Sequence, residues 1–154
     1  MVKKTERGLY IKPIAKGTTI DHLPAGSAFK ILRIVGKADS TITVAIRVPS
    51  RKLGVKDLVF IENKILSDEE LEKIALIAPN ATVNIIENNE VKQKIRLSAP
   101  KEAHNIIVCI NPNCITNREN VPSRFYIDSE TGKAKCHYCE RIMSREEYSS
   151  RIRV

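Results

Sequence analysis

The chain has 154 residues, enough for one domain or two small ones, and its 26 Lys and Arg against 18 Asp and Glu give a formal charge of +8. Without a run of 18 apolar residues or a signal-peptide pattern after Met1, we expect neither a membrane-spanning nor a secreted protein, and a cytoplasmic location by default. Residues 1–100 hold most of the basic excess, with 17 Lys and Arg against 11 Asp and Glu. This positive charge could bind nucleic acid, a nucleotide or an acidic partner surface, and a solvated basic surface explains it equally well.

The first elements are predicted from local pattern. Residues 9–14 predict a short strand, which Pro13 assigns to a sheet edge, and residues 16–22 predict a turn-rich connector. An apolar stripe at helical spacing then predicts a helix that ends near Gly36: Ala28, Ile31, Leu32 and Val35.

The next stretch predicts two strands. Residues 41–48 alternate strictly, with one apolar face made of Ile42, Val44, Ile46 and Val48. Residues 57–62 are apolar on both faces and predict an interior strand of the same sheet.

A second helix and a hairpin follow. Ser67 and Glu70 form a capping box, which predicts a helix that Pro79 closes, with a buried stripe of Leu71, Ile74, Ala75 and Ala78. Residues 81–86 and 91–97 predict two strands joined through Asn88 and Asn89, which tolerate positive φ.

The predicted order is strand, helix, strand, strand, helix, strand, strand. It is typical of a ferredoxin-like α+β fold, an antiparallel sheet with two helices, here with one extra strand. Residues 99–101 are the predicted hinge, so we expect one domain at residues 1–100 and a second at 101–154.

All four cysteines fall in the second domain, spaced C-x4-C, 21 residues, then C-x2-C. This spacing predicts a tetrahedral four-thiolate site for zinc, with iron as the main competitor and two disulfides as the alternative. Four thiolates leave no open coordination position, so the metal would stabilise the fold and activate no substrate. The predicted ligands are Cys109, Cys114, Cys136 and Cys139, and His137 is expected outside the set.

The second domain is predicted to be a small all-β, zinc-ribbon-like unit. We expect strands at residues 105–108, 124–127 and 133–135, and a short helix that begins at the capping box of Ser144 and Glu147.

No catalytic constellation is evident in the sequence. Asp21 and His22 could orient one another for acid–base chemistry, but no nucleophile motif or glycine-rich phosphate loop accompanies them. Four lysines near predicted strand ends could bind phosphate or be solvated: Lys52, Lys56, Lys92 and Lys94.

Several segments together resemble the regulatory chain of aspartate carbamoyltransferase over residues 9–142. They are residues 17–25 (Gly-Thr-Thr-Ile-Asp-His-Leu-Pro-Ala), 48–50, 56–58, 61–63, 78–84, 111–115 and 136–140. The resemblance implies a non-catalytic subunit of pyrimidine biosynthesis. It also implies an allosteric domain that binds CTP, UTP and ATP, a regulatory-chain homodimer, and a zinc domain that contacts the catalytic chain and helps to hold catalytic trimers together.

Matching positions imply a nucleotide site made of Ile11, Lys12, Ile14, Asp21, His22, Lys56, Leu58, Thr82, Asn84, Ile86, Val91 and Lys94. Asn111, Asn113 and Glu140 match positions near the catalytic chain. Phe60 stands where the family usually has a lysine that contacts the nucleotide, and Asn89 replaces an aromatic residue.

The main alternative is a nucleic-acid-binding zinc-ribbon protein, which basic charge and a metal site would suit. With three Phe and four Tyr, and no clustering of basic residues in the second domain, base-stacking platforms are scarce. We therefore expect no nucleic-acid partner.

Overall fold

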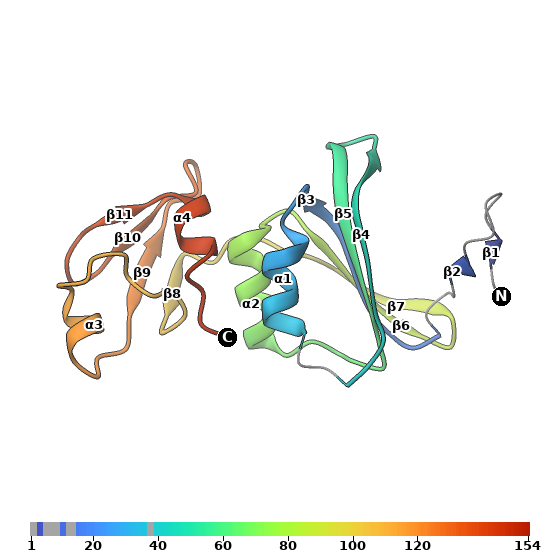
Figure 1. Cartoon of the computed structure of the whole chain (residues 1–154), viewed down its shortest axis with the longest axis horizontal. Helices are drawn as coiled ribbons and strands as arrows, with labels where there is room; N and C mark the ends of the chain where they lie inside the picture. Colours follow the sequence, from blue (N-terminus) through green and yellow to red (C-terminus); the bar gives the residue numbers. More distant parts are fainter. Residues whose placement is uncertain (1–2, 5–9, 12–14, 37–38) are drawn as a thin grey trace.

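The computed structural model describes residues 3–4, 10–11, 15–36 and 39–154 (Figure 1). Of the strand predicted at residues 9–14, only Tyr10–Ile11 is described, as β2, which pairs with β1 at Lys3–Lys4. Two residues of the predicted nucleotide site, Lys12 and Ile14, lie outside the described residues.

A five-stranded antiparallel sheet in the order β4-β5-β3-β6-β7 forms the first half of the molecule. The strands are β3 (Gly17–Pro24), β4 (Ile42–Ser50), β5 (Gly54–Glu62), β6 (Thr82–Glu87) and β7 (Glu90–Arg96). The prediction of a connector at residues 16–22 was wrong, because this segment is the central strand β3. Its threonines suit an interior strand, since the buried Thr18 hydroxyl donates to the carbonyl of Lys64 (2.6 Å).

Helices α1 (Ala28–Val35) and α2 (Asp68–Ile77) cover one face of this sheet, so the predicted ferredoxin-like fold is confirmed (Figure 1). The extra strand is β7, beside β6, and Asn88 and Asn89 turn between the two at positive φ, as predicted. The core between sheet and helices is apolar, with six fully buried side chains from both layers: Ile20, Val59, Ile61, Ile31, Val35 and Ile74.

The two helices begin in different ways. At α2 the predicted capping box is present: the Ser67 hydroxyl accepts from the Glu70 amide and the Glu70 carboxylate accepts from the Ser67 amide, both at 3.2 Å. At α1 the Ser27 side chain makes no cap. A buried carboxylate, Asp57 of β5, accepts instead from the amides of Gly26 (2.8 Å) and Ala28 (3.1 Å).

A bulge breaks the alternation predicted for residues 41–48. The β4–β5 register shifts between Ala45 and Val48, and Arg47 has a φ of 56°. Ile42 pairs with Ile61 but Val48 pairs with Lys56, and these two partners lie on opposite faces of β5. The prediction that Val48 shares a face with Ile42 was therefore wrong, and Ile46, inside the bulge, is 39% exposed. The other oxygen of Asp57 accepts from the Arg47 amide (2.9 Å) and so fixes the bulge.

A second sheet of four strands, in the order β11-β10-β9-β8, forms the other half. Its strands are β8 (Glu102–His104), β9 (Arg124–Ile127), β10 (Ala134–Cys136) and β11 (Ile142–Met143), with helices α3 (Ile115–Arg118) and α4 (Arg145–Ser149) beside it. The capping box predicted at Ser144 begins α4, as expected. The strand predicted at residues 105–108 was misplaced, because pairing ends at His104 and Ile107 bridges instead to Ile152 near the C-terminus.

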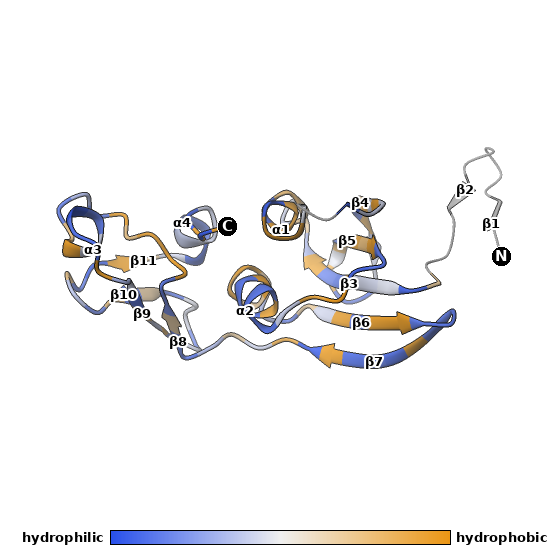
Figure 2. Ribbon diagram, turned by 90° about the horizontal axis from the view of Figure 1, so that it is seen from below, coloured by the Kyte–Doolittle hydropathy of each residue, from blue (hydrophilic) through white to orange (hydrophobic). Residues whose placement is uncertain are grey.

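Helices α1 and α2 lie between the five-stranded sheet and α4 in both views (Figures 1 and 2). Between β7 and β8 the chain has neither helix nor strand, and the domain boundary near residue 100 stays a prediction. In the described part of the chain, no helix is long and apolar enough to cross a membrane.

Candidate functional site

The structure brings the sulfurs of all four cysteines together, with every pair within 4.8 Å. Cys109 and Cys114 flank the turn before α3, and Cys136 and Cys139 flank the turn between β10 and β11. Two of the Sγ–Sγ distances are 3.6 Å (Cys109 to Cys139) and 3.8 Å (Cys114 to Cys136). Thiolates about 2.3 Å from one tetrahedral ion would be about 3.8 Å apart, whereas a disulfide would require about 2.05 Å. The arrangement therefore fits a four-thiolate metal centre.

Hydrogen bonds around the cysteines fix the first turn in this geometry. The Thr116 hydroxyl donates to Cys114 Sγ (3.2 Å), and the Asn117 amide donates to the carbonyls of Cys109 (2.9 Å) and Asn111 (2.7 Å). These bonds restrain the first cysteine turn and one of its sulfurs, as polar groups around metal ligands generally do.

His137 lies outside the cluster, as expected from the sequence. Its side chain is exposed, and Nδ1 is 2.7 Å from the Tyr126 hydroxyl. The ring also lies edge-on to Tyr138.

The thiols differ in acidity. Burial raises the pKa of the Cys109 thiol to about 12. Burial would also raise the pKa of Cys139, but hydrogen bonds from the Arg141 amide and the Asn111 side chain lower it to about 7. A metal must displace the proton from a buried thiol such as Cys109, so metal uptake releases protons and strengthens as pH rises.

The second candidate site is the face of the five-stranded sheet opposite α1 and α2. Strand register aligns a row of side chains across it: Phe60 and Asn84 both pair with Thr19, and Asn84 also pairs with Lys94. The Asn84 side-chain amide donates to the Thr19 hydroxyl (3.2 Å). Side chains alternate between faces along a strand, so residues two positions from this row share its face.

That alternation gathers the remaining predicted nucleotide residues. Leu58 and Lys56 lie two and four positions before Phe60 on β5, and Thr82 and Ile86 lie two positions to either side of Asn84 on β6. Val91 of β7 pairs with Ile86 and is 58% exposed. Of Ile11, the structure describes only the backbone pairing with Lys3.

Asp21 and Lys56 form an ion pair at the end of this face, with 2.9 Å between Asp21 Oδ1 and Lys56 Nζ. Burial would raise the pKa of Asp21, but the Lys56 ammonium and the His22 backbone amide hold it below its usual value. His22 follows at a φ of 59°, where β3 shifts its register against β5. A charged pair and an imidazole thus meet near the ends of two interior strands, β3 and β5.

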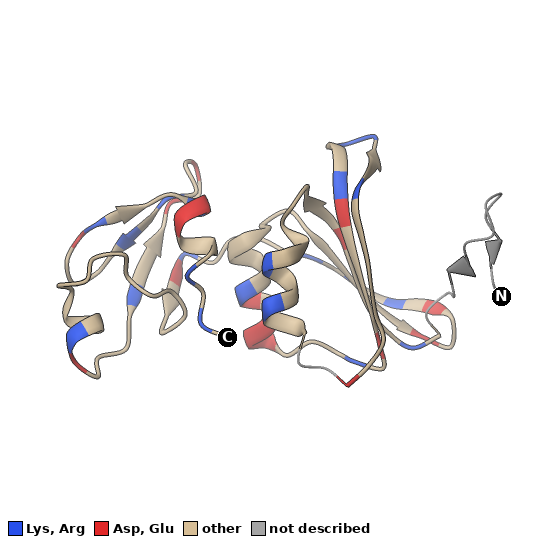
Figure 3. Ribbon diagram, viewed as in Figure 1, with Lys and Arg blue, Asp and Glu red and all other residues tan. Residues whose placement is uncertain are grey.

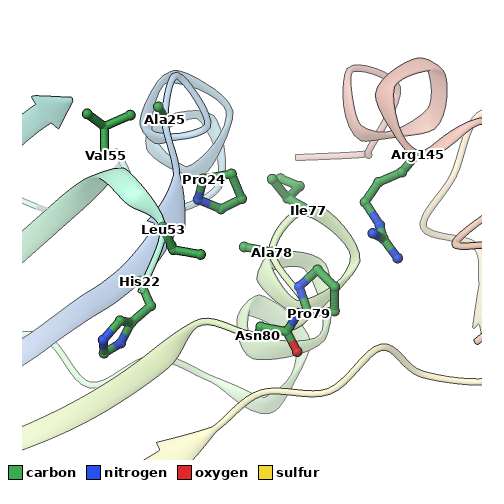
Figure 4. Close-up of a pocket in the computed structure, with 10 residues that line it drawn as sticks. All are labelled: His22, Pro24, Ala25, Leu53, Val55, Ile77, Ala78, Pro79, Asn80 and Arg145. Carbon is green, nitrogen blue, oxygen red and sulfur yellow. The ribbon is translucent and has the colours of Figure 1, made fainter. Parts of the chain in front are cut away.

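A cavity of about 340 Å³ opens beside His22, between the two halves of the molecule (Figure 4). Leu53 and Val55 line one side, Ala78 and Pro79 line the end of α2, and Arg145 reaches in from α4. The Arg145 Nε is buried without a hydrogen-bond partner among the described residues.

Sequence reasoning missed Thr19, Asp57 and Arg145. Thr19 lay in the segment predicted to be a connector. Asp57 was treated as one end of an apolar strand, although an acidic residue in a run that is otherwise apolar is a signal for a buried cap. Nothing local to the sequence marks Arg145, because its surroundings come from the other half of the chain.

Comparison with known proteins gives one consistent answer. The family model "Aspartate carbamoyltransferase regulatory chain, allosteric domain" matches residues 9–98, and the model of the metal binding domain of the same chain matches residues 101–149. The aspartate carbamoyltransferase regulatory chain of Pyrococcus horikoshii is 48% identical over 144 residues, which cover 90% of this chain and 95% of the relative. Those of Thermococcus sibiricus (53% over 137 residues, 88% and 91%) and Thermofilum pendens (47% over 148 residues, 92% and 93%) are similarly close.

Proposed function

The chain belongs to the family of aspartate carbamoyltransferase regulatory chains, and from this premise we propose that it transmits nucleotide signals to the catalytic chain of that enzyme. Family membership makes it a regulatory subunit with an allosteric and a metal-binding domain, not the catalytic chain. The observation that carries the proposal is that the predicted nucleotide residues of β5, β6 and β7 share one sheet face with Asp21, while the cysteines cluster in the other half.

The proposed effectors are CTP, UTP and ATP, bound across the open sheet face. Lys94 supplies an exposed positive charge for triphosphate oxygens, and Asn84 and Thr19 supply amide and hydroxyl groups for the sugar. The Asp21–Lys56 pair and His22 complete the polar edge. One site for three nucleotides makes them competitors.

Nucleotide binding to the purified chain tests this site. Lys94→Met should weaken the affinity for CTP and ATP about tenfold or more in calorimetry, because a charge-assisted hydrogen bond is lost. Lys133→Met, in the other half of the molecule, is the matched control and should bind as the wild type does. Equal affinity of wild type and Lys94→Met would contradict the assignment.

The proposed metal is zinc, held by the four cysteine thiolates. The sulfur spacing and the all-thiolate donor set support it. Zinc at these four ligands would fix the two cysteine turns relative to one another. Its contribution is structural, because four thiolates complete a tetrahedral coordination sphere.

The cysteine turns also form the proposed contact with the catalytic chain. Asn111 and Asn113, bonded to one another through the Asn111 side chain and the Asn113 amide (3.0 Å), and Glu140 lie in these turns. Large apolar side chains stand exposed around them: Ile110, Ile115, Tyr138 and Ile142. Exposed apolar groups beside rigid polar ones are the composition of a protein interface.

The proposed regulatory pair uses the β4 edge of the five-stranded sheet. β4 has nine residues and carries one charged side chain, Arg47 at the bulge. The opposite edge, β7, exposes charged residues along most of its length. Charges protect an edge strand from pairing, so β4, the edge with the single charge, is the one that suits a second copy.

The mass of a mixture with catalytic chain, measured by light scattering, tests the assembly role. With zinc, the two chains should form one large complex in which pairs of regulatory chains bridge catalytic trimers. A chelator that strips zinc should release the catalytic chain and unfold the metal domain. A chelated sample whose chains still co-elute would count against the proposal.

A further inference from the structure

Two hydrogen bonds join α1 to the C-terminal end of α4. Lys30 Nζ donates to Ser149 Oγ (2.7 Å), and the Arg33 guanidinium donates to the Ser150 carbonyl (3.2 Å). No other side-chain hydrogen bond crosses from residues 15–100 to residues 101–154 in the part of the chain that the structure describes. Figure 3 shows basic positions on α1 and acidic ones on α4, the two helices that these bonds connect. Both donors are cationic side chains of α1 that lie against the C-terminus of α4, where the helix carbonyls favour positive charge.

The Ser149 hydroxyl is held in one orientation. Ser149 is 4% exposed, and its hydroxyl donates to the Glu146 carbonyl one turn earlier (3.1 Å). Its oxygen is therefore free to accept from Lys30 and has no second way to donate. The length of the bond to Lys30 therefore depends on the distance between α1 and α4.

On the side of the sheet, α1 is tied to the proposed nucleotide face through β5. Asp57 accepts from two amides at the start of α1, and the preceding residue, Lys56, pairs with Asp21 on the opposite face. A ligand that draws Lys56 or Asp21 toward its phosphates would move β5, and Asp57 would pass that movement to α1. Lys30 lies on the first turns of the same helix.

On the side of the metal centre, the segment after α4 is tied to the first cysteine turn. The Arg151 guanidinium donates to the carbonyls of Val108 (3.0 Å) and Cys109 (3.1 Å). The Val108 amide donates in return to the Arg151 carbonyl (2.9 Å), and the Arg153 amide donates to that of Ile106 (2.8 Å). Four bonds therefore make the end of α4 and the approach to Cys109 one unit.

The joint between α1 and α4 is loosely packed. Lys30 and Ser149 themselves line a second cavity of about 380 Å³, and the cavity beside His22 adjoins it through Pro24 and Arg145. A polar contact beside open space can lengthen or break without forcing close-packed side chains apart. The two halves can therefore shift at this joint at little cost.

We propose that the Lys30–Ser149 bond is the coupling joint through which nucleotide occupancy of the sheet reaches the first cysteine turn and, beyond it, the catalytic chain. This inference rests on the proposed regulatory function. Lys30 and Ser149 are positioning residues: neither belongs to the nucleotide row or the cysteine cluster. Coupling requires two arrangements of the chain that bind nucleotide with different affinity. In this proposal the two arrangements differ in whether α4 lies against α1, with the Lys30–Ser149 bond formed, or away from it, with the bond broken.

The test uses holoenzyme assembled from catalytic chain and full-length regulatory chain carrying Lys30→Met or Ser149→Ala. Three quantities are measured: the mass of the complex, the dissociation constants of CTP and ATP, and the ratio of carbamoyl-transfer rates with and without saturating nucleotide. Both variants should assemble and bind nucleotide within about threefold of wild type, while the rate ratio falls toward one by at least about threefold. Lys30→Arg, which keeps a cationic donor, should retain most of the response, and Lys133→Met, at an exposed lysine away from both the joint and the nucleotide face, should retain all of it.

The double variant separates a shared joint from two independent effects. If Lys30 and Ser149 act through one bond, Lys30→Met with Ser149→Ala should lose no more response than either single change. If either single variant kept the wild-type rate ratio, the proposed coupling role of the Lys30–Ser149 bond would be wrong, while the proposed regulatory function would stand. The same conclusion would follow if the double variant lost as much of the response as the two single variants together. A wild-type holoenzyme that binds nucleotide without any change in rate would overturn both. Ser149→Ala removes only the hydroxyl oxygen and should disturb the fold less than Lys30→Met, so the proposal can still be tested if Lys30→Met does not fold.

Discussion

Asp57 shows how one buried side chain can organise several elements. The carboxylate is fully buried, and its two oxygens accept three backbone amides, from Gly26, Ala28 and Arg47. These bonds begin α1 and fix the bulge in β4, which the sequence does not encode locally. Hydrogen bonds from backbone amides to a carboxylate are stronger than those to a neutral acceptor. Three such bonds offset the desolvation cost of burying this side chain.

Asp57→Ala should therefore lower the free energy of unfolding of the zinc-loaded chain by about 3 kcal/mol, because three amides lose a charged partner within the fold. Urea denaturation followed by circular dichroism measures it. Asp39→Ala, an exposed acid before β4, is the control and should change stability by less than about 0.5 kcal/mol. A similar stability of both variants would mean that Asp57 does not hold α1.

Phe60 is the position of the proposed nucleotide row at which the family resemblance leads us to expect a lysine. It is half-buried between Thr43 and Thr19 in the register of the sheet, where it offers an aromatic face but no charge. Its neighbours Asn84 and Lys94 keep the polar end of the row.

Phe60→Lys should add a charged donor to the row and tighten CTP binding about tenfold, since a hydrogen bond from an ammonium contributes about 1.5 kcal/mol or more. Phe60→Leu controls for loss of the ring without a gain of charge. Competition binding with CTP and ATP measures the affinity ratio of the two nucleotides. An unchanged ratio in Phe60→Lys would show that position 60 does not contact the nucleotide.

At the scale of elements, the N-terminal cap of α2 was predicted from the sequence and is present in the structure. Glu70 completes the capping box and pairs with Lys64 (3.1 Å). Burial would raise the pKa of Glu70, but the Lys64 ammonium and the Ser67 amide lower it below its usual value. A carboxylate with a depressed pKa stabilises the fold above its unfolded pKa, and this contribution is lost as pH falls through the folded pKa.

The unfolding free energy of wild type should therefore fall more steeply below about pH 4.5 than that of Glu70→Gln, which has no charge to lose. The difference should be at most about 1 kcal/mol, since the pair is partly solvated. Urea titrations at pH 7 and pH 3.5 measure it, with Glu72→Gln on the same helix as the control, because Glu72 forms no ion pair among the described residues. Parallel pH profiles of wild type and Glu70→Gln would contradict the role of the pair.

Elements with strong local signals were predictable, and those defined by distant contacts were not. The two capping boxes and the Asn88–Asn89 turn were read correctly because caps and tight turns are local chemistry. Strand β3 was missed because Gly, Thr, Asp and Pro are common in turns, and only its two neighbours make it the centre of the sheet. The same holds for residues 105–108, whose pairing partner lies near the C-terminus.

For the candidate sites, spacing alone identified the four cysteines that the structure brings together, because a metal site imposes short, regular intervals. The nucleotide face was predicted through family resemblance, and strand alternation places its members from β5, β6 and β7 on one side of the sheet. The joint at Lys30 and Ser149 could not be predicted, since it depends on how two halves of the chain meet.

At the scale of the whole molecule, a ferredoxin-like half with an open sheet face and a cysteine-rich half meet at α1, α2 and α4 (Figure 1). In the proposed function the sheet face of the first half binds the nucleotide, and the cysteine turns of the second, with exposed Ile110, Ile115, Tyr138 and Ile142 beside them, contact the partner chain. The proposed regulatory function requires that a nucleotide bound to the first half affect the second.

The most direct test is the rate of carbamoyl transfer by the zinc-loaded chain in complex with the catalytic chain of the same source, measured with and without CTP, UTP and ATP. We predict a complex much larger than either component, whose rate changes with at least one nucleotide, while the catalytic chain alone does not respond. Failure to form the complex, or a complex whose rate is the same at every nucleotide concentration, would contradict the account.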